Sequence, residues 1–337
     1  CGTLHPFLPQ IAYVKDSKLE ILDFVSKQVL HSMFTPEFGV KSLKYSPDGK
    51  FLAVGGASGM FTLLDVTKTY KEVYDCRTPN MFQDVIGIEF SSDSKTLVYL
   101  FEKGGSSEDI KNIVFINVKS KKEYAMAASP EYAGARISIS PDNKILAVAG
   151  SALWTFDMKT GTRLKEYVCN RAVGAIWSRD GKFLAVGWEY KKGNYLPGLL
   201  EMRSAGNPEK QLYIFDGYAK AAAACVSHPY KSVFTVGYIS GEIHVFDMNT
   251  GLHSGTVMKG EDKWINHRPS SLTYSPDAKL LAVGVDWGRA MILESETLKL
   301  RKEILQYDGT IYTFMFSNDG QFLYGGGGYV DDRSYFR

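Results

Sequence analysis

Short stretches in which apolar and polar residues alternate recur along the whole chain, and most are followed by a polar turn. In residues 40–45 (VKSLKY) the two kinds alternate, residues 46–49 (SPDG) interrupt them, and residues 51–54 (FLAV) resume the apolar run. Alternation with a period of two predicts half-buried β-strands. Asp closes a turn through its own side chain, and Gly accepts a positive φ. Two further strands are predicted over residues 61–66 and 71–76.

This unit of turn and apolar strand occurs eight times. Its copies are 38 to 50 residues apart, a period typical of four-stranded propeller blades rather than of helical or leucine-rich arrays. The sequence therefore predicts an all-β propeller of four-stranded antiparallel blades. The copies start at His5, Ser46, Ser91, Ser140, Ser178, His228, Ser275 and Ser317. The predicted third strands end in an apolar residue and Asp at Leu22-Asp23, Phe156-Asp157, Phe215-Asp216 and Phe246-Asp247.

Eight turns bound only seven full periods, so the number of blades has two solutions. The simpler is one propeller over residues 1–337 with seven blades, closed by N- and C-terminal strands that share a blade. Residues 310–316 would then supply the inner strand beside those around Ile11, Leu22 and Val29. Closure removes exposed sheet edges. Because residues 322–325 would duplicate the strand that starts at Ile11, eight blades or a slice of a larger protein are the alternatives.

The closing aromatic-Asp pairs and the SPDG turns resemble the WD40-repeat family and its bacterial relatives of the YVTN type. The likeness covers essentially the whole chain. The Gly-His pair that opens many such repeats is missing, and the closing dipeptides quoted above are Phe-Asp or Leu-Asp rather than Trp-Asp. The resemblance implies the propeller fold, but it does not imply the buried Asp-His-Ser-Trp network of that family.

Composition and charge exclude some classes of function. The chain is 45% hydrophobic and 23% charged, which is ample for a core. Its net charge of +2, with Lys and Arg spread among Asp and Glu, gives no nucleic-acid footprint. The tract Lys119–Lys122 is interpreted as a solvated turn. No run approaches the about 18 apolar residues that cross a bilayer, so no transmembrane segment is predicted.

The four cysteines are isolated, so neither a zinc site nor a disulfide framework is predicted. Cys76, Cys169 and Cys225 are interpreted as small, partly buried side chains. The opening Cys-Gly-Thr is similar to a bacterial lipoprotein after removal of its signal, which implies a lipid anchor at Cys1 and a place in the cell envelope. The alternative is an ordinary excised terminus and a cytoplasmic location.

Catalytic motifs are not found in the sequence, and no metal or organic cofactor is predicted. His5 and His228 precede Pro where Ser does in the other repeats, so they are interpreted as turn variants. Gly325–Gly328 is interpreted as a turn at the end of a second strand. A structural role in the turns is predicted for Asp48, Asp93, Asp142, Asp180, Asp277 and Asp319.

Binding chemistry is predicted where the repeats are interrupted. Residues 102–112 and 189–211 are insertions between second and third strands, and residues 78–84 and 260–269 connect blades. In an antiparallel blade these connections all leave at the same end. Aromatic, Met and Arg side chains are enriched at interfaces. The predicted partner-binding residues are Met81, Phe82, Trp188, Tyr190, Lys191, Lys192, Tyr195, Leu199, Leu200, Arg203, Tyr238, Trp264, Arg268 and Trp287.

The sequence thus favours a non-catalytic scaffold that binds a protein or peptide on the face carrying loops 102–112, 189–211 and 260–269, as a subunit of a larger complex. In the alternative interpretation of the second insertion, Tyr195 and the leucines form a local cluster. Two other functions stay open. One is an enzyme or small-ligand sensor with its site at the central channel. The other is a microtubule-associated repeat protein, from a loose likeness to the echinoderm microtubule-associated-protein-like family.

Overall fold

The structure is a computed structural model that describes most of the chain. It divides into two compact units, Cys1–Ala175 and Ile176–Arg337, and each is treated by itself. The described residues are 2–34, 39–77, 84–102, 111–129, 137–167, 172–188, 200–204, 211–215, 222–238, 241–257, 269–285, 289–305, 310–328 and 334–336.

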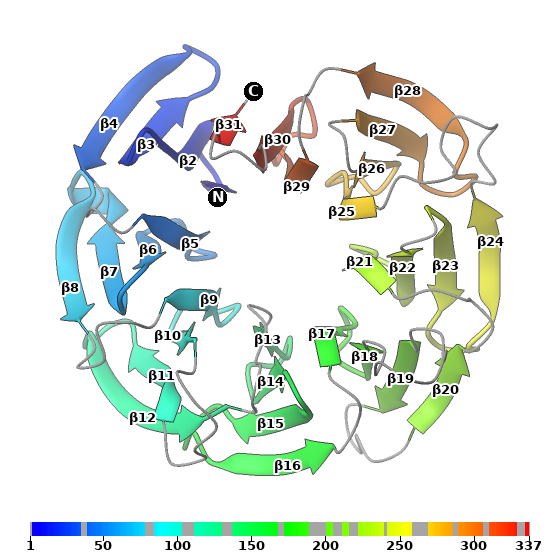
Figure 1. The fold of residues 1–337 in the computed structure, drawn as a ribbon, viewed down its shortest axis with the longest axis horizontal. Coiled ribbons are helices and arrows are strands. Elements are labelled where there is room, and N and C mark those ends of the chain that lie inside the picture. The colour runs from blue at the N-terminus through cyan, green and yellow to red at the C-terminus, as the bar shows by residue number, and fades with distance from the viewer. Residues whose placement is uncertain are drawn as a thin grey trace. The chain divides into compact units, whose positions relative to one another are not determined.

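The first unit contains four four-stranded antiparallel sheets, here called blades A to D in chain order (Figure 1). In each, the strands are hydrogen-bonded in sequence order. Blade A has β1 Gly2–Leu4, β2 Gln10–Lys15, β3 Lys18–Asp23 and β4 Gln28–Phe34, and blade B has β5 Val40–Tyr45, β6 Phe51–Gly56, β7 Met60–Asp65 and β8 Lys71–Arg77, with the 3-10 turn η1 Val66–Lys68 between the last two. Blade C has β9 Val85–Phe90, β10 Thr96–Phe101, β11 Lys111–Asn117 and β12 Lys122–Ala128, and blade D has β13 Ile137–Ile139, β14 Ile145–Ala149, β15 Leu153–Asp157 and β16 Arg163–Tyr167.

The second unit continues the same plan with blades E to H, and the boundary between the units falls within the first strand of blade E. Blade E has β17 Ala172–Trp177, β18 Phe183–Trp188, β19 Leu200–Ser204 and β20 Gln211–Phe215, and blade F has β21 Ala222–Ser227, β22 Val233–Tyr238, β23 Ile243–Asp247 and β24 His253–Val257. Blade G has β25 Pro269–Tyr274, β26 Leu280–Val285, β27 Arg289–Glu294 and β28 Leu300–Leu305, and blade H has β29 Thr310–Phe316, β30 Leu323–Gly328 and β31 Ser334–Phe336.

The prediction of an all-β propeller with four-stranded antiparallel blades is confirmed. Seven of the sheets have four strands, and the three described strands of blade H form an eighth. One strand pairing differs from the sequence prediction. Residues 2–4 themselves are the first strand of blade A, with Leu4 opposite Ile11, whereas Thr310–Phe316 pairs with β30. The reason is that the turn at His5 folds the N-terminal residues back onto β2.

The turns between first and second strands are held by one repeated set of hydrogen bonds. The Ser46 hydroxyl donates to Asp48 Oδ1 over 2.7 Å, and that oxygen accepts the backbone N–H of Lys50 at 3.1 Å. The Ser46 oxygen also accepts the N–H of Phe51 at 2.9 Å. These bonds explain the predicted structural role of the six aspartates. The other pairs are Ser91–Asp93, Ser140–Asp142, Ser178–Asp180, Ser275–Asp277 and Ser317–Asp319.

Histidine replaces this Ser-Asp pair in two blades, in agreement with the interpretation of these residues as turn variants. His5 Nδ1 accepts the backbone N–H groups of Phe7 and Leu8, at 3.1 and 2.9 Å. Its other ring nitrogen then carries the proton and lies 3.0 Å from the carbonyl oxygen of Gly49 in the next blade. His228 Nδ1 accepts two backbone N–H groups in the same way, each at 3.0 Å. Both rings must therefore stay neutral to hold their turns.

The neutral histidines predict a pH-dependent stability. Burial lowers the pKa of His5 and of His228 below the usual value of 6.5. The unfolded chain therefore takes up protons first as the pH falls below about 6.5, and the free energy of unfolding decreases there, by up to about 1.4 kcal/mol per pH unit and histidine. Above about pH 6.5 both states are neutral and the contribution vanishes.

The chain offers its own control for this prediction. The double substitution His5→Ser and Phe7→Asp recreates the Ser-Pro-Asp turn of Ser46, and His228→Ser with Tyr230→Asp does the same in blade F. Urea unfolding between about pH 5 and 7.5 should give a shallower pH slope for the variants. An unchanged slope would mean that the folded histidines take up protons as readily as the unfolded ones.

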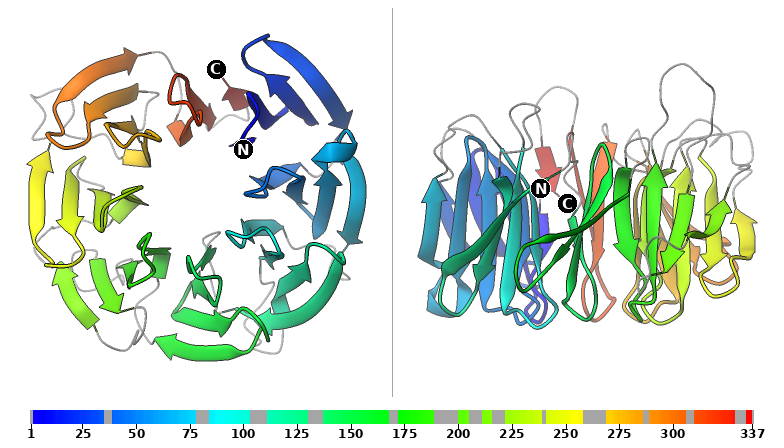
Figure 2. Two further views of the ribbon diagram at one scale, coloured as in Figure 1. Left: turned by 180° about the vertical axis from the view of Figure 1, so that it is seen from behind. Right: turned by 90° about the horizontal axis from the view of Figure 1, so that it is seen from below.

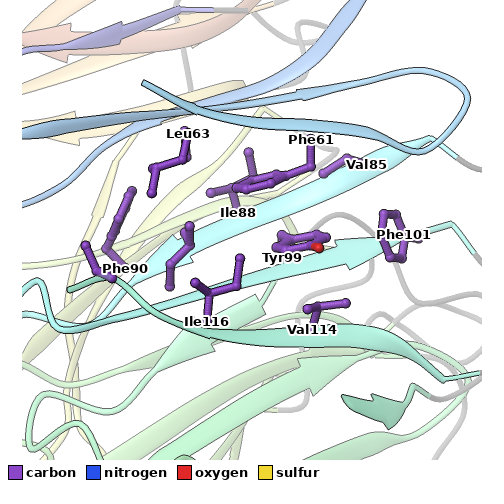
Figure 3. Packing of buried hydrophobic residues seen from close by; sticks show 12 residues of the cluster. Phe61, Leu63, Val85, Ile88, Phe90, Tyr99, Phe101, Val114 and Ile116 are labelled. Carbon is purple, nitrogen blue, oxygen red and sulfur yellow. The ribbon is translucent and has the colours of Figure 1, made fainter. Parts of the chain in front are cut away.

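Hydrophobic cores lie between neighbouring blades. Between blades B and C, Phe61 stacks on Tyr99 with ring centroids 4.0 Å apart and an interplanar angle of 3° (Figure 3). Both side chains are 0% exposed. Similar clusters join A to B and C to D in the first unit, and E to F, F to G and G to H in the second. Each core forms between sheets, so no blade buries its apolar faces alone.

The glycine tract Gly325–Gly328 lies within strand β30 rather than in the predicted turn. A Cβ atom on Gly325 would come within 2.8 Å of the Phe314 ring. The glycine therefore makes room for an aromatic side chain on the neighbouring strand, and this is a packing role.

Candidate functional site

The candidate site is the end of the blades at which second strands lead into third strands. Three of these connections in the first unit are short and described: β2 to β3, β6 to β7 and β14 to β15. The connection in blade C is longer, because β10 ends at Phe101 and β11 begins at Lys111. Its residues 103–110 lie outside the described part of the chain.

The base of this insertion is fastened by a buried asparagine. Asn112 is 0% exposed, and its side-chain amide donates to the carbonyl oxygen of Phe101 at 2.8 Å and to the Ser129 hydroxyl at 2.9 Å. Its amide oxygen accepts the backbone N–H of Ser129 at 2.8 Å. The register shifts between Lys111 and Ile113, so Asn112 occupies a β-bulge. Bulges re-aim side chains, and this one joins the ends of β10 and β12 beneath the insertion.

A second set of contacts braces the same region against blade B. Asp84 precedes β9, and its backbone carbonyl accepts the N–H of Glu102 at 2.8 Å. Its carboxylate lies 3.3 Å from Lys41 Nζ and 3.4 Å from the backbone nitrogen of Ser58. Lys41 is also at a bulge, between the paired residues Val40 and Ser42. The start and end of the insertion-bearing hairpin are therefore held by blade B.

The first strands of blades B and C, which lie side by side, carry one more ion pair. Lys44 Nζ on β5 lies 3.0 Å from Glu89 Oε2 on β9. Both side chains are partly exposed, 43% and 27%. Such a pair contributes little stability, about 0–1 kcal/mol. Within the described ranges, no group of three or more His, Cys, Asp or Glu side chains is placed to hold a metal ion.

Blade E differs from the sequence prediction. Residues 200–204 form its third strand, paired with β18 so that Gly187 faces Leu200, and Gln211–Phe215 is its fourth strand. The predicted insertion 189–211 therefore narrows to residues 189–199, and Phe215 does not close a third strand. The physical reason is burial: Met202 is 2% exposed in the core between blades E and F.

Four of the predicted partner-binding residues lie in strands. Trp188 ends β18, and Leu200 and Arg203 lie in β19, where Arg203 pairs with Leu184 and is partly exposed. Tyr238 ends β22 but is only 1% exposed, because it packs in the core between blades E and F. Tyr238 is therefore not available to a partner, and this prediction is wrong.

The other predicted partner-binding residues fall outside the described ranges. They are Met81, Phe82, Tyr190, Lys191, Lys192, Tyr195, Leu199, Trp264, Arg268 and Trp287.

The residues that brace the blade C insertion were not predicted. Asn112 was included in the insertion as an ordinary loop residue, although it lies beside the apolar run Ile113–Ile116, where an amide needs buried partners. An amide next to an apolar strand was therefore the one sequence feature that indicated a buried, hydrogen-bonded Asn112. Asp84 and Lys41 gave no signal, because their pairing depends on how blade C sits beside blade B.

The geometry defines the class of protein as a β-propeller, and comparison with known proteins refines it. The family model for the WD domain, G-beta repeat (WD40), matches residues 27–64, from the outer strand of blade A to the third strand of blade B. The predicted resemblance to the WD40-repeat family is confirmed. Comparison with curated proteins gave no match.

Many solved structures resemble the chain, among them the following two. The C-terminal WD40 domain of Sif2 aligns with a TM-score of 0.78 and 13% identity, over 99% of this chain and 94% of that one. Hydrazine synthase of Kuenenia stuttgartiensis aligns with a TM-score of 0.67 and 14% identity, over 92% of this chain and 98% of that one. At such identities the likeness concerns the fold. WD40 propellers typically mediate protein interactions.

Across the described ranges, no helix has the length and apolar character needed to span a bilayer.

Proposed function

We propose that this chain is a non-catalytic interaction scaffold that docks a protein or peptide at the end of its blades carrying loops 102–112, 189–199 and 260–269. The blades supply a rigid base, and side chains of the interrupted connections supply specificity. Exposed aromatic, Met and Arg side chains on such connections would bury a large area at low entropic cost.

The observation that carries this proposal is the bracing of the blade C insertion. Its base is held by three hydrogen bonds of Asn112, which is fully buried, and by the contacts of Asp84 with blade B. A loop with a fixed base loses less conformational entropy on binding than a loop with a free base. The described turns at the opposite end are all short, so the long connections between strands lie at the proposed end.

Replacement of the two insertions provides the test. We expect a variant in which a short Gly-Ser linker replaces residues 190–199 to lose a co-purifying protein partner. A variant in which such a linker replaces residues 103–110 should bind that partner more weakly. Both should keep the wild-type melting temperature, since β18, β19, β10 and β11 remain intact. Quantitative affinity purification with mass spectrometry measures the change.

A matched variant carries the triple substitution Lys182→Gln, Lys279→Gln and Lys299→Gln at the opposite end, and it should retain the partner. Equal retention of every partner by the loop variants would contradict the proposed docking end.

A second candidate is an enzyme or small-ligand sensor with a site along the first strands. It is favoured by the Lys44–Glu89 pair on neighbouring strands and by the Lys41–Asp84 pair at the start of β9. A metal or organic cofactor found by native mass spectrometry of the purified protein would support it over the scaffold.

A further inference from the structure

The end of the first unit opposite the proposed docking end is built from short turns that touch one another from blade to blade. The right-hand view of Figure 2 shows them along the lower edge of the blue to green blades. The backbone N–H of Asp48 in blade B donates to the Ser94 hydroxyl in blade C at 3.0 Å. Within each blade the two turns also meet, through Val66 N to Lys50 O in blade B and Val118 N to Lys95 O in blade C, both at 2.9 Å. The four turns of blades B and C therefore form one continuous surface.

Blade C departs from the other blades in the charge of its second turn. Asp23, Asp65 and Asp157 begin the corresponding turns of blades A, B and D, where each carboxylate accepts backbone N–H groups. In blade C this position is Asn117, whose amide oxygen accepts the N–H of Ser120 at 2.9 Å. The turn keeps its hydrogen bond but has no negative charge at this position, and the next residues of the turn include Lys119, Lys121 and Lys122.

The result is a cluster of lysines, here called the lysine patch. Three of its members, Lys50, Lys68 and Lys95, pair with the turn aspartates and have side chains 62%, 63% and 79% exposed. The other four have no carboxylate partner among the described residues: Lys71, Lys119, Lys121 and Lys122.

The turns of the patch carry a net charge of +4, because they contain its seven lysines and three aspartates, Asp48, Asp65 and Asp93. The net charge is still +2 when Glu72 and Glu123, at the adjoining strand ends, are included. The Glu123 carboxylate is occupied by a hydrogen bond from the Tyr74 hydroxyl at 2.6 Å.

The chemistry of the patch discriminates between anionic partners. Its cations are all lysines, which are compact, strongly hydrated point charges, whereas arginine is the residue suited to bidentate phosphate recognition. Lys121 Nζ lies 5.6 Å from the centroid of the Phe51 ring, so this ring is covered by a cation. Single-stranded nucleic acid needs open aromatic faces for its bases to stack on. Lysines near the surface of an anionic leaflet are instead attracted to its headgroups by about 1 kcal/mol each.

We propose that the lysine patch of blades B and C binds the surface of a membrane that contains anionic lipids. Binding is peripheral and electrostatic: the lysine ammonium groups lie near the headgroups, and no side chain inserts into the hydrocarbon. The proposed protein-docking end then faces away from the bilayer, because the patch lies at the other end of the same blades. A protein held in this way presents its docking loops to partners in solution.

Vesicle flotation tests this proposal with the full chain. We expect binding to vesicles of phosphatidylcholine with about 30 mol % phosphatidylserine at about 0.05 M NaCl, and release at about 0.5 M, because salt screens exposed charges. Pure phosphatidylcholine vesicles should not bind. The substitutions Lys119→Gln, Lys121→Gln and Lys122→Gln together should lower the vesicle affinity about 100-fold.

The matched control is the triple variant Lys182→Gln, Lys279→Gln and Lys299→Gln, which removes the same charge from turns of the second unit and should bind as the wild type does. Thermal unfolding of both variants verifies that they fold. Three outcomes overturn the proposal: no binding to anionic vesicles, equal loss in the control variant, or tighter binding of single-stranded DNA than of the vesicles at the same salt concentration.

Discussion

Replacing Phe61 with alanine is expected to lower the free energy of unfolding by about 3–5 kcal/mol. The Phe61 ring is 0% exposed and stacks on Tyr99 of the neighbouring blade at 4.0 Å. Its removal takes away buried apolar contact and leaves a cavity between two sheets that are each held in place by other blades, so the gap cannot close easily. Urea denaturation followed by tryptophan fluorescence measures the loss.

The control for this prediction is Phe7→Ala. Phe7 is 71% exposed, so its replacement should change the free energy of unfolding by less than about 0.5 kcal/mol. Tyr99→Ala in the Phe61→Ala background should cost less than it does alone, because the two rings share one contact. Additive effects would show that the two rings do not stabilise each other.

Replacing Asn112 with alanine is expected to have the second large effect, a destabilisation of about 2–4 kcal/mol. The change removes the three hydrogen bonds that Asn112 makes with the Phe101 carbonyl, the Ser129 hydroxyl and the Ser129 backbone N–H, in a fully buried place. The base of the blade C insertion should also loosen. Hydrogen exchange of Phe101 and Ser129 amides should rise before global unfolding, and binding of the protein partner should weaken.

Asn117 provides the matched control, because it lies on the same strand but is exposed, and its amide oxygen accepts one N–H in a turn. Asn117→Ala should cost about 0.5–1 kcal/mol and leave partner binding unchanged. If Asn112→Ala destabilises the protein but the partner binds as before, the bracing of the insertion is structural only.

Much of the fold could be predicted from local sequence because each blade repeats the same local chemistry. The Ser46-Pro-Asp-Gly turn forms from hydrogen bonds within six residues, so its sequence is enough to place it. The replacement of Ser by His5 was equally visible, since a ring nitrogen can accept the same backbone N–H groups. The prediction of the third strand in blade E failed because this strand, Leu200–Ser204, is short and lies within a long segment that lacks the repeat pattern.

The candidate site was less predictable for a different reason. Tyr238 and Trp188 both end second strands, and the sequence assigns them the same role. Tyr238 is buried because blade E packs over it, which the repeat itself does not encode. Likewise, the lysines of blade C and those of blade B form one surface because the two blades pack together, with Lys121 beside Phe51 of blade B.

The sequence by itself determined the turns between first and second strands, most of the strands and the number of strands in a blade, since these depend on alternation and on hydrogen bonds between residues close in the chain. The tertiary structure decided which residues are buried, which strand begins blade A, and which charges are neighbours. Those properties depend on contacts between blades, whose partners are about 40 to 50 residues apart in a chain of similar repeats. Local pattern carries no information on such contacts, because every blade presents nearly the same pattern to its neighbour.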